Sequence, residues 1–224
     1  MHVTRDRLCK MIEHTLLRAY ATQEDIDELC DEAVRYGFAA VAINPAWTGY
    51  CARRLSGSGV GVAVAVGFPL GSNTSHIKAE ETREAVRNGA TEIDMVANIG
   101  ALKSGYPQFV EQEIRAIVKA ASKASVKVIL ETCYLTNQEK IALCEISERA
   151  GARFVKTSTG FGNAGATVED VMLMRDSVGD RIGVKAAGGI RTWEDALAMA
   201  EAGAARIGTS AGVAIADSFG RTPS

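Results

Sequence analysis

Short apolar runs alternate with longer amphipathic stretches along the chain. The runs are bounded by turn-forming residues, chiefly Gly, Pro, Asn, Ser and Thr, and such runs predict buried strands. Between them, apolar residues recur at the three- and four-residue spacing of a helix. We predict seven strands, in residues 38–44, 60–68, 92–98, 126–132, 153–160, 181–189 and 205–208, and a weaker eighth strand around residues 14–17.

Start and stop signals support a helix after each strand. Thr22 is followed three residues later by Asp25, and Thr136 by Glu139, which is the pattern of a capping box. Several helices end at a glycine that precedes the next strand, as short helix-to-strand loops do. The predicted helices cover residues 22–36, 47–55, 75–88, 107–122, 136–151, 167–177, 192–202 and 210–219.

This regular alternation predicts the fold class. Strands that alternate with helices run parallel and are joined by right-handed crossovers. Eight such units predict an α/β fold of the (β/α)₈, or TIM, barrel type, and we expect residues 1–224 to form a single domain. A doubly wound open sheet is the alternative, but no Gly-x-Gly-x-x-Gly motif follows the first strand.

Composition excludes several functional classes. Hydrophobic residues make up 47% of the chain and charged residues 23%, and the net charge is −2 without a basic block. We therefore expect no nucleic-acid partner. No apolar run is long enough to span a membrane, and the polar N-terminus lacks a signal-peptide core, so we expect a cytoplasmic protein. The 5 cysteines and 3 histidines show no metal-ligand spacing, which predicts reduced thiols and no metal site.

Two lysines lie in apolar strands, which is an unusual place for them. Lys156 stands near the end of the run in 153–160, and Lys185 occupies the same place in 181–189. Burial of an ammonium group is costly, and two close together also repel each other. This pattern indicates that one of the two amines works unprotonated, as a nucleophile.

The alternation of side chains along a strand predicts which residues share the barrel interior. One choice of parity places Asp94, Glu131, Lys156 and Lys185 inside together, and leaves apolar residues against the helices. Barrel enzymes carry catalytic groups at the C-terminal ends of their strands, where these residues lie. The alternative is a salt-bridge network that only fills the barrel, and for Glu131 the two interpretations stay equally open.

Glycine-rich turns after the last two strands predict a phosphate site. Gly188 and Gly189 follow one strand, and Gly208 and Ser210 lie at the end of the next. Glycine lets backbone N–H groups approach an anion, and the loops after strands seven and eight are the usual phosphate site of such barrels. Ordinary strand-to-helix turns are the alternative.

These residues carry a resemblance to the deoxyribose-phosphate aldolases, which are class I aldolases on a (β/α)₈ barrel. The similarity covers nearly the whole chain. The matching segments are His14-Thr15-Leu16-Leu17, Val64-Ala65-Val66-Gly67-Phe68-Pro69-Leu70-Gly71, Glu92-Ile93-Asp94-Met95-Val96, Glu131-Thr132-Cys133-Tyr134-Leu135, Phe154-Val155-Lys156-Thr157-Ser158-Thr159-Gly160-Phe161, Val184-Lys185-Ala186-Ala187-Gly188-Gly189-Ile190-Arg191-Thr192 and Arg206-Ile207-Gly208-Thr209-Ser210.

The resemblance implies a reaction and a role for each candidate residue. Lys156 would be the Schiff-base nucleophile, with Lys185 lowering its pKa and Asp94 taking part in proton transfer. Gly188, Gly189, Gly208 and Ser210 would bind the substrate phosphate. The implied reaction is reversible cleavage of 2-deoxy-D-ribose 5-phosphate to D-glyceraldehyde 3-phosphate and acetaldehyde, in deoxyribose phosphate catabolism. It implies no cofactor, since an iminium serves as the electron sink, and a homodimer.

Three positions depart from the family pattern. Glu13 replaces an aspartate that many members have, which we expect to matter little, and Ala211 replaces a second serine after Ser210. The chain also ends without the C-terminal tyrosine that some members have. Two rival functions stay open: a phosphosugar isomerase or lyase with Asp94 or Glu131 as its base, and a non-catalytic phosphosugar-binding barrel.

Overall fold

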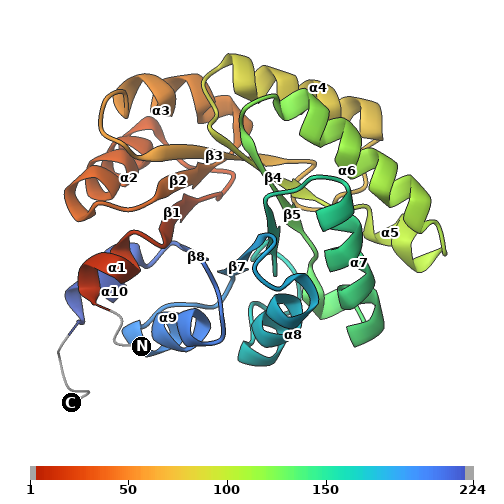
Figure 1. Cartoon of the computed structure of the whole chain (residues 1–224). Coiled ribbons are helices and arrows are strands. Elements are labelled where there is room, and N and C mark those ends of the chain that lie inside the picture. The colour runs from red at the N-terminus through yellow and green to blue at the C-terminus, as the bar shows by residue number, and fades with distance from the viewer. Residues whose placement is uncertain (1–3, 220–224) are drawn as a thin grey trace.

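The computed structural model describes residues 4–219, which form one closed barrel of eight parallel strands inside a ring of helices (Figure 1). Neighbouring strands follow chain order, and β1 closes the barrel by pairing with β8. The predicted (β/α)₈ barrel is confirmed, and the open-sheet alternative is wrong. The strands are β1 (Ile12–Leu16), β2 (Ala40–Ile43), β3 (Gly61–Val66), β4 (Glu92–Val96), β5 (Ser125–Ile129), β6 (Phe154–Lys156), β7 (Gly183–Ala187) and β8 (Arg206–Thr209).

The helices begin where the capping signals predicted. The Thr22/Asp25 and Thr136/Glu139 capping boxes are both formed. The short helices α1 and α5 and two 3-10 turns, η1 and η2, are absent from the predicted helices. The helical elements are α1 (Arg5–Cys9), α2 (Gln23–Tyr36), η1 (Pro45–Trp47), α3 (Thr48–Arg54), α4 (Ser75–Arg87), α5 (Ile99–Lys103), α6 (Pro107–Ala121), η2 (Thr132–Tyr134), α7 (Asn137–Arg149), α8 (Val168–Val178), α9 (Trp193–Glu201) and α10 (Gly212–Asp217).

The outer and inner faces of the barrel strands carry different side chains. Outward side chains such as Ile93, Val128 and Val184 belong to the main hydrophobic core, as the parity argument predicted. Inside the barrel, β2 and β3 present only small side chains over part of their length, where Ala40, Ala42 and Ala63 form a separate cluster. Small residues on this side leave room for the long charged side chains that enter from the other strands.

Glycine makes further room within β7 and β8. A Cβ atom at Gly183 would lie 2.2 Å from the ring of Phe154, and one at Gly208 would lie 3.0 Å from Cε of Lys185. Contacts this short force a neighbour to move, so glycine at these positions allows Phe154 and Lys185 to extend into the interior.

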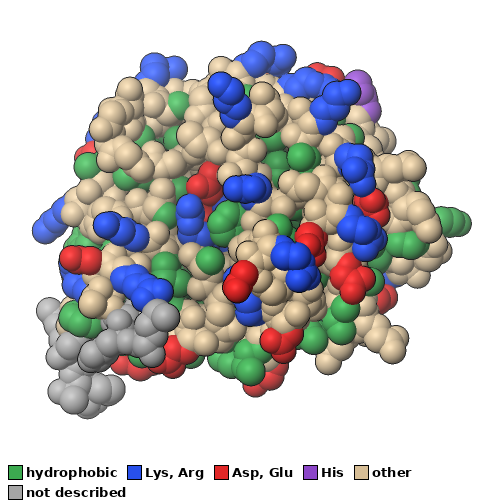
Figure 2. Space-filling model, viewed as in Figure 1, with side chains coloured by type: hydrophobic (Ala, Val, Ile, Leu, Met, Phe, Trp, Pro, Cys, Tyr) green, Lys and Arg blue, Asp and Glu red, His purple; other side chains and the backbone are tan. Residues whose placement is uncertain are grey.

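The surface carries charges of both signs. On the face shown in Figure 2, Lys and Arg side chains are interspersed with Asp and Glu side chains. No helix within residues 4–219 is long and apolar enough to cross a membrane. The five cysteines are all free thiols, four of them buried. The C-terminal segment without tyrosine lies outside the described residues.

Candidate active site

Two lysines from neighbouring strands converge on one carboxylate inside the barrel. Lys156 on β6 is the register partner of Lys185 on β7, so their side chains enter side by side. Oδ2 of Asp94 on β4 lies 2.9 Å from Nζ of Lys156 and 2.7 Å from Nζ of Lys185. The structure thus brings together three of the four side chains that strand parity placed in one cluster.

The fourth, Glu131, lies elsewhere, and this part of the prediction is wrong. Strand β5 ends at Ile129, and Glu131 adopts a left-handed backbone conformation with φ 53°, so alternation no longer sets its direction. Its buried carboxylate accepts hydrogen bonds from the backbone N–H of Thr159, at 3.2 Å, and from the Thr159 hydroxyl. Glu131 therefore ties the loop after β5 to the loop after β6.

Lys127 and Glu13 complete the cluster, and sequence reasoning did not include them. Nζ of Lys127 lies 2.9 Å from Oδ1 of Asp94, on the side away from Lys156. Glu13 contacts Lys185 and lies 3.4 Å from Lys127. Lys127 has the same parity as Ile129, so alternation in β5 could have revealed it. The Glu13 side chain is fully buried among these charges, so position 13 belongs to the cluster, and the expectation that Glu in place of Asp matters little stays a prediction.

Arg206 and Glu92 extend the cluster deeper into the barrel. One guanidinium nitrogen of Arg206 lies 3.3 Å from both Glu13 and Glu92, and Glu92 also pairs with Lys127. We call the connected set the ionic network. Its members are Glu13, Glu92, Asp94, Lys127, Lys156, Lys185 and Arg206.

The environment of the network favours different protonation states for different members. Burial, reinforced by the charge of Lys185 and opposed by Asp94, lowers the pKa of Lys156 from 10.5 to about 8. Although burial opposes ionisation of Asp94, the charges of Lys127, Lys156 and Lys185 hold the pKa of Asp94 well below its usual value. Lys127 is also buried, yet the carboxylates around it raise its pKa. Of Lys127 and Lys156, Lys156 is therefore the amine that loses its proton more readily.

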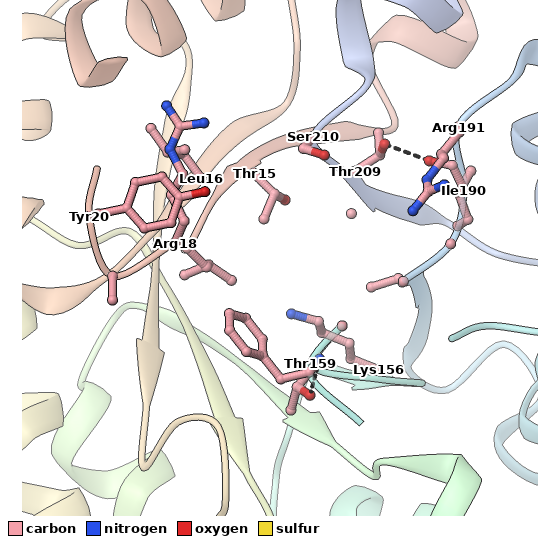
Figure 3. A pocket seen from close by; sticks show the side chains of 18 residues that line it. Thr15, Leu16, Arg18, Tyr20, Lys156, Thr159, Ile190, Arg191, Thr209 and Ser210 are labelled. Carbon is pink, nitrogen blue, oxygen red and sulfur yellow. Dashed lines mark hydrogen bonds between the residues drawn. The ribbon is translucent and has the colours of Figure 1, made fainter. Parts of the chain in front are cut away.

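A cavity of about 590 Å³ opens above Lys156. Figure 3 shows the Lys156 amine directed into this space, with Ser210, Thr209 and Arg191 on the far side. The four residues predicted to bind phosphate, Gly188, Gly189, Gly208 and Ser210, all line it.

Two features of the cavity wall suit an anion. Gly188 and Gly189 have φ of 88° and 81°, a backbone conformation that favours glycine. Within residues 4–219, no protein acceptor binds the backbone N–H groups of Gly189 and Ser210. Arg191 also lines the cavity and makes no ion pair within the described chain, whereas Arg18 on the opposite rim is paired with Asp25. In the sequence, Arg191 follows Gly188, Gly189 and Ile190. This position beside the glycine turn could have indicated Arg191 as a phosphate-binding residue.

Comparisons with known proteins indicate the same family of aldolases over nearly the whole chain. A family model described as DeoC/LacD family aldolase matches residues 9–218. The chain is 58% identical over 209 residues to the deoxyribose-phosphate aldolase of Streptococcus sanguinis (strain SK36), covering 93% of this chain and 95% of that protein. The protein of the same name from Streptococcus pneumoniae serotype 2 (strain D39) matches to the same extent. A solved structure, the tetrameric deoxyribose phosphate aldolase from Aeropyrum pernix, superposes with a TM-score of 0.91 at 37% identity, covering 97% of this chain and 93% of that chain.

Proposed function

The chain belongs to the DeoC/LacD family of aldolases, and we propose that it reversibly cleaves 2-deoxy-D-ribose 5-phosphate through a Schiff base on Lys156. The products are D-glyceraldehyde 3-phosphate and acetaldehyde. The observation that carries the mechanism is the Lys156 amine, which faces the cavity and has its pKa lowered to about 8. A lysine with an ordinary pKa of about 10.4 would be almost entirely ammonium at neutral pH and a poor nucleophile.

The proposed reaction breaks the C2–C3 bond of the open-chain sugar. The Lys156 amine adds to the C1 aldehyde, and loss of water gives a protonated imine. Removal of the C3 hydroxyl proton then releases the three-carbon aldehyde, while the bonding electrons move into the imine and form an enamine. Protonation at C2 and hydrolysis release acetaldehyde and restore the amine. Asp94 and Lys185 adjoin Lys156 and supply groups that can move these protons, directly or through water.

The phosphate site is proposed at the opposite wall of the cavity. The free N–H groups of Gly189 and Ser210, together with Gly188 and Gly208, would hold the phosphate oxygens. Arg191 would add a guanidinium, which binds phosphate strongly through charge-assisted hydrogen bonds. Ala211 supplies no hydroxyl, and Thr209 binds the carbonyl of Ile190 instead, so Ser210 is left as the hydroxyl donor at this turn.

Trapping of the covalent intermediate tests the proposal. The protein would be mixed with acetaldehyde and reduced with borohydride, and the adduct would be mapped by peptide mass spectrometry. We expect an ethyl group confined to Lys156. An adduct on Lys185 would reverse the two lysine roles. A folded protein that binds phosphosugar but yields no site-specific adduct would favour an isomerase that uses Asp94 as its base, or a binding barrel.

Adduct formation is expected to increase with pH and to level off above about pH 8, because that is the pKa to which burial lowers Lys156. Below this pH the amine is protonated and has no lone pair, and above it the free amine predominates. Initial trapping rates measured from about pH 6 to about pH 10 check this. A rate still increasing at the upper limit would indicate an ordinary lysine.

Arg191→Ala is expected to raise KM for 2-deoxy-D-ribose 5-phosphate about tenfold, since a charge-assisted phosphate contact is lost. Turnover of unphosphorylated 2-deoxy-D-ribose should stay unchanged. Steady-state kinetics with both sugars separate the two effects. Arg153→Ala, at an exposed arginine preceding the N-terminal end of β6, is the matched control. Equal losses on both sugars would contradict a phosphate contact.

The wider biological setting is proposed on the family resemblance. A cytoplasmic homodimer that acts in deoxyribose phosphate catabolism fits the sequence pattern and the small phosphosugar substrate. Light scattering after size-exclusion chromatography distinguishes the proposed dimer from a tetramer such as that of the Aeropyrum pernix protein.

A further inference from the structure

Lys127 is a fully buried amine that the proposed reaction does not use. Its side chain has no exposed surface, and it is absent from the residues that line the cavity above Lys156. It lies on the inner side of Asp94, where it binds the oxygen that Lys156 and Lys185 leave free. Lys127 therefore acts on the Lys156 amine through the carboxylates that it contacts, chiefly Asp94, which also binds Lys156.

The ionic network balances its charge only when Lys156 is neutral. It holds three carboxylates, Glu13, Glu92 and Asp94, and it holds Lys127, Lys185 and Arg206 as cations in addition to Lys156. With Lys156 as an amine, three cations face three carboxylates. With Lys156 as an ammonium, one positive charge has no partner. The side chains are between 0% and 23% exposed, so water compensates an excess charge poorly.

We propose that Lys127 is a positioning residue that keeps Lys156 nucleophilic, because it takes up the carboxylate charge that would otherwise hold Lys156 as an ammonium. The inference rests on the proposed Schiff base at Lys156. Charged groups from five strands face this centre: Glu13 on β1, Glu92 and Asp94 on β4, Lys127 on β5, Lys185 on β7 and Arg206 on β8.

The position of Lys127 fits this role better than simple filling of the barrel. Lys127 contacts all three carboxylates of the network, whereas Lys156 contacts only Asp94. Its ammonium also lies 6.0 Å from the centre of the Phe154 ring, where the ring face attracts a cation. Both features favour a permanent charge on Lys127, and the pKa of Lys127 is accordingly raised by its carboxylate partners, although burial opposes this.

The charge balance predicts shifts of opposite sign for two single variants. Lys127→Met removes a cation, so one carboxylate is unmatched until Lys156 takes up a proton. The pH midpoint of acetaldehyde adduct formation should move up by about 1–2 units. Glu92→Gln removes a carboxylate and leaves an excess cation, so the midpoint should move down. The double variant restores the balance, and its midpoint should return to within about half a unit of the parent's.

The experiment measures the rate of reductive trapping of acetaldehyde on Lys156 across pH for these three proteins, for Lys127→Arg and for the parent. Lys127→Arg keeps the charge and should keep the midpoint. Lys78→Met is the matched control, since Lys78 is an equally buried lysine that pairs with Glu113 outside the barrel interior. It should leave the midpoint unchanged, whatever it does to stability.

The outcomes separate this inference from the proposed function. If the parent forms no adduct on Lys156, the Schiff-base proposal itself fails. If the parent forms the adduct but Lys127→Met leaves its midpoint in place, or the double variant keeps the full shift, the charge-balance role is overturned. If Lys127→Met does not fold, Glu92→Gln decides alone, and a midpoint that does not move down overturns the inference.

Discussion

Replacing Lys156 by leucine is expected to lower kcat/KM for 2-deoxy-D-ribose 5-phosphate by about 10⁴-fold or more, because it removes the amine on which the proposed covalent intermediate forms. The same variant should be nearly as stable as the parent, within about 1.5 kcal/mol, since leucine fills similar space and the remaining charges still balance. Coupled-enzyme kinetics and urea denaturation measure the two effects.

A second buried lysine provides the contrast in stability. Lys78 pairs with Glu113 at 2.8 Å, and neither side chain is exposed. Lys78→Leu leaves the buried carboxylate of Glu113 without its ion-pair partner, which typically lowers the free energy of unfolding by about 3–5 kcal/mol. If Lys156→Leu lowered the free energy of unfolding as much as Lys78→Leu, Lys156 would be part of a required ion pair, and its description as a neutral amine would be wrong.

Asp94→Asn is expected to lower kcat by about 10²–10⁴-fold, the range attributed to a positioned proton-transfer group. It should also lower the free energy of unfolding by about 3–5 kcal/mol, because Lys127 and Lys185 lose their shared buried carboxylate. The variant removes a charge that favours the ammonium form of Lys156, so the pKa of Lys156 should decrease further. Activity should therefore not recover at high pH.

The pH profile of Asp94→Asn separates proton transfer from pKa tuning. Because the variant lowers the pKa of Lys156, a rate equal to or above the parent's at acidic and neutral pH would mean that Asp94 acts only by setting the charge of Lys156. Asp31→Asn is the control, because Asp31 is 71% exposed and its pair with Arg54 lies on the surface. Surface ion pairs contribute at most about 1 kcal/mol, so this variant should resemble the parent in both stability and rate.

Local patterns were enough to predict the barrel and much of the site. Strand runs, capping boxes and glycine stops depend only on neighbouring residues, so the element order follows from them. Parity within each strand placed Asp94, Lys156 and Lys185 on the inner face, where the structure has them in contact. The glycine turns after β7 and β8 likewise lie on the cavity wall beside Lys156.

Prediction failed where a strand ended earlier than its apolar run. Residues 126–132 read as one strand, but β5 ends at Ile129. Beyond that point the left-handed conformation of Glu131 turns its carboxylate to Thr159 instead of the lysines. Alternation holds only while the backbone stays extended, and the sequence carries no clear signal for the residue at which it stops.

The sequence by itself determined the fold, the inward lysines and the turns suited to phosphate, because each of these depends on residues close together in the chain. Only the closed barrel decided how the interior charges balance. Glu13 meets Lys185 across 172 positions, and Arg206 meets Glu92 across 114. Such partners depend on the stagger at which β1 closes against β8, which no local pattern encodes. The lowered pKa of Lys156 therefore depends on the assembled interior of the barrel.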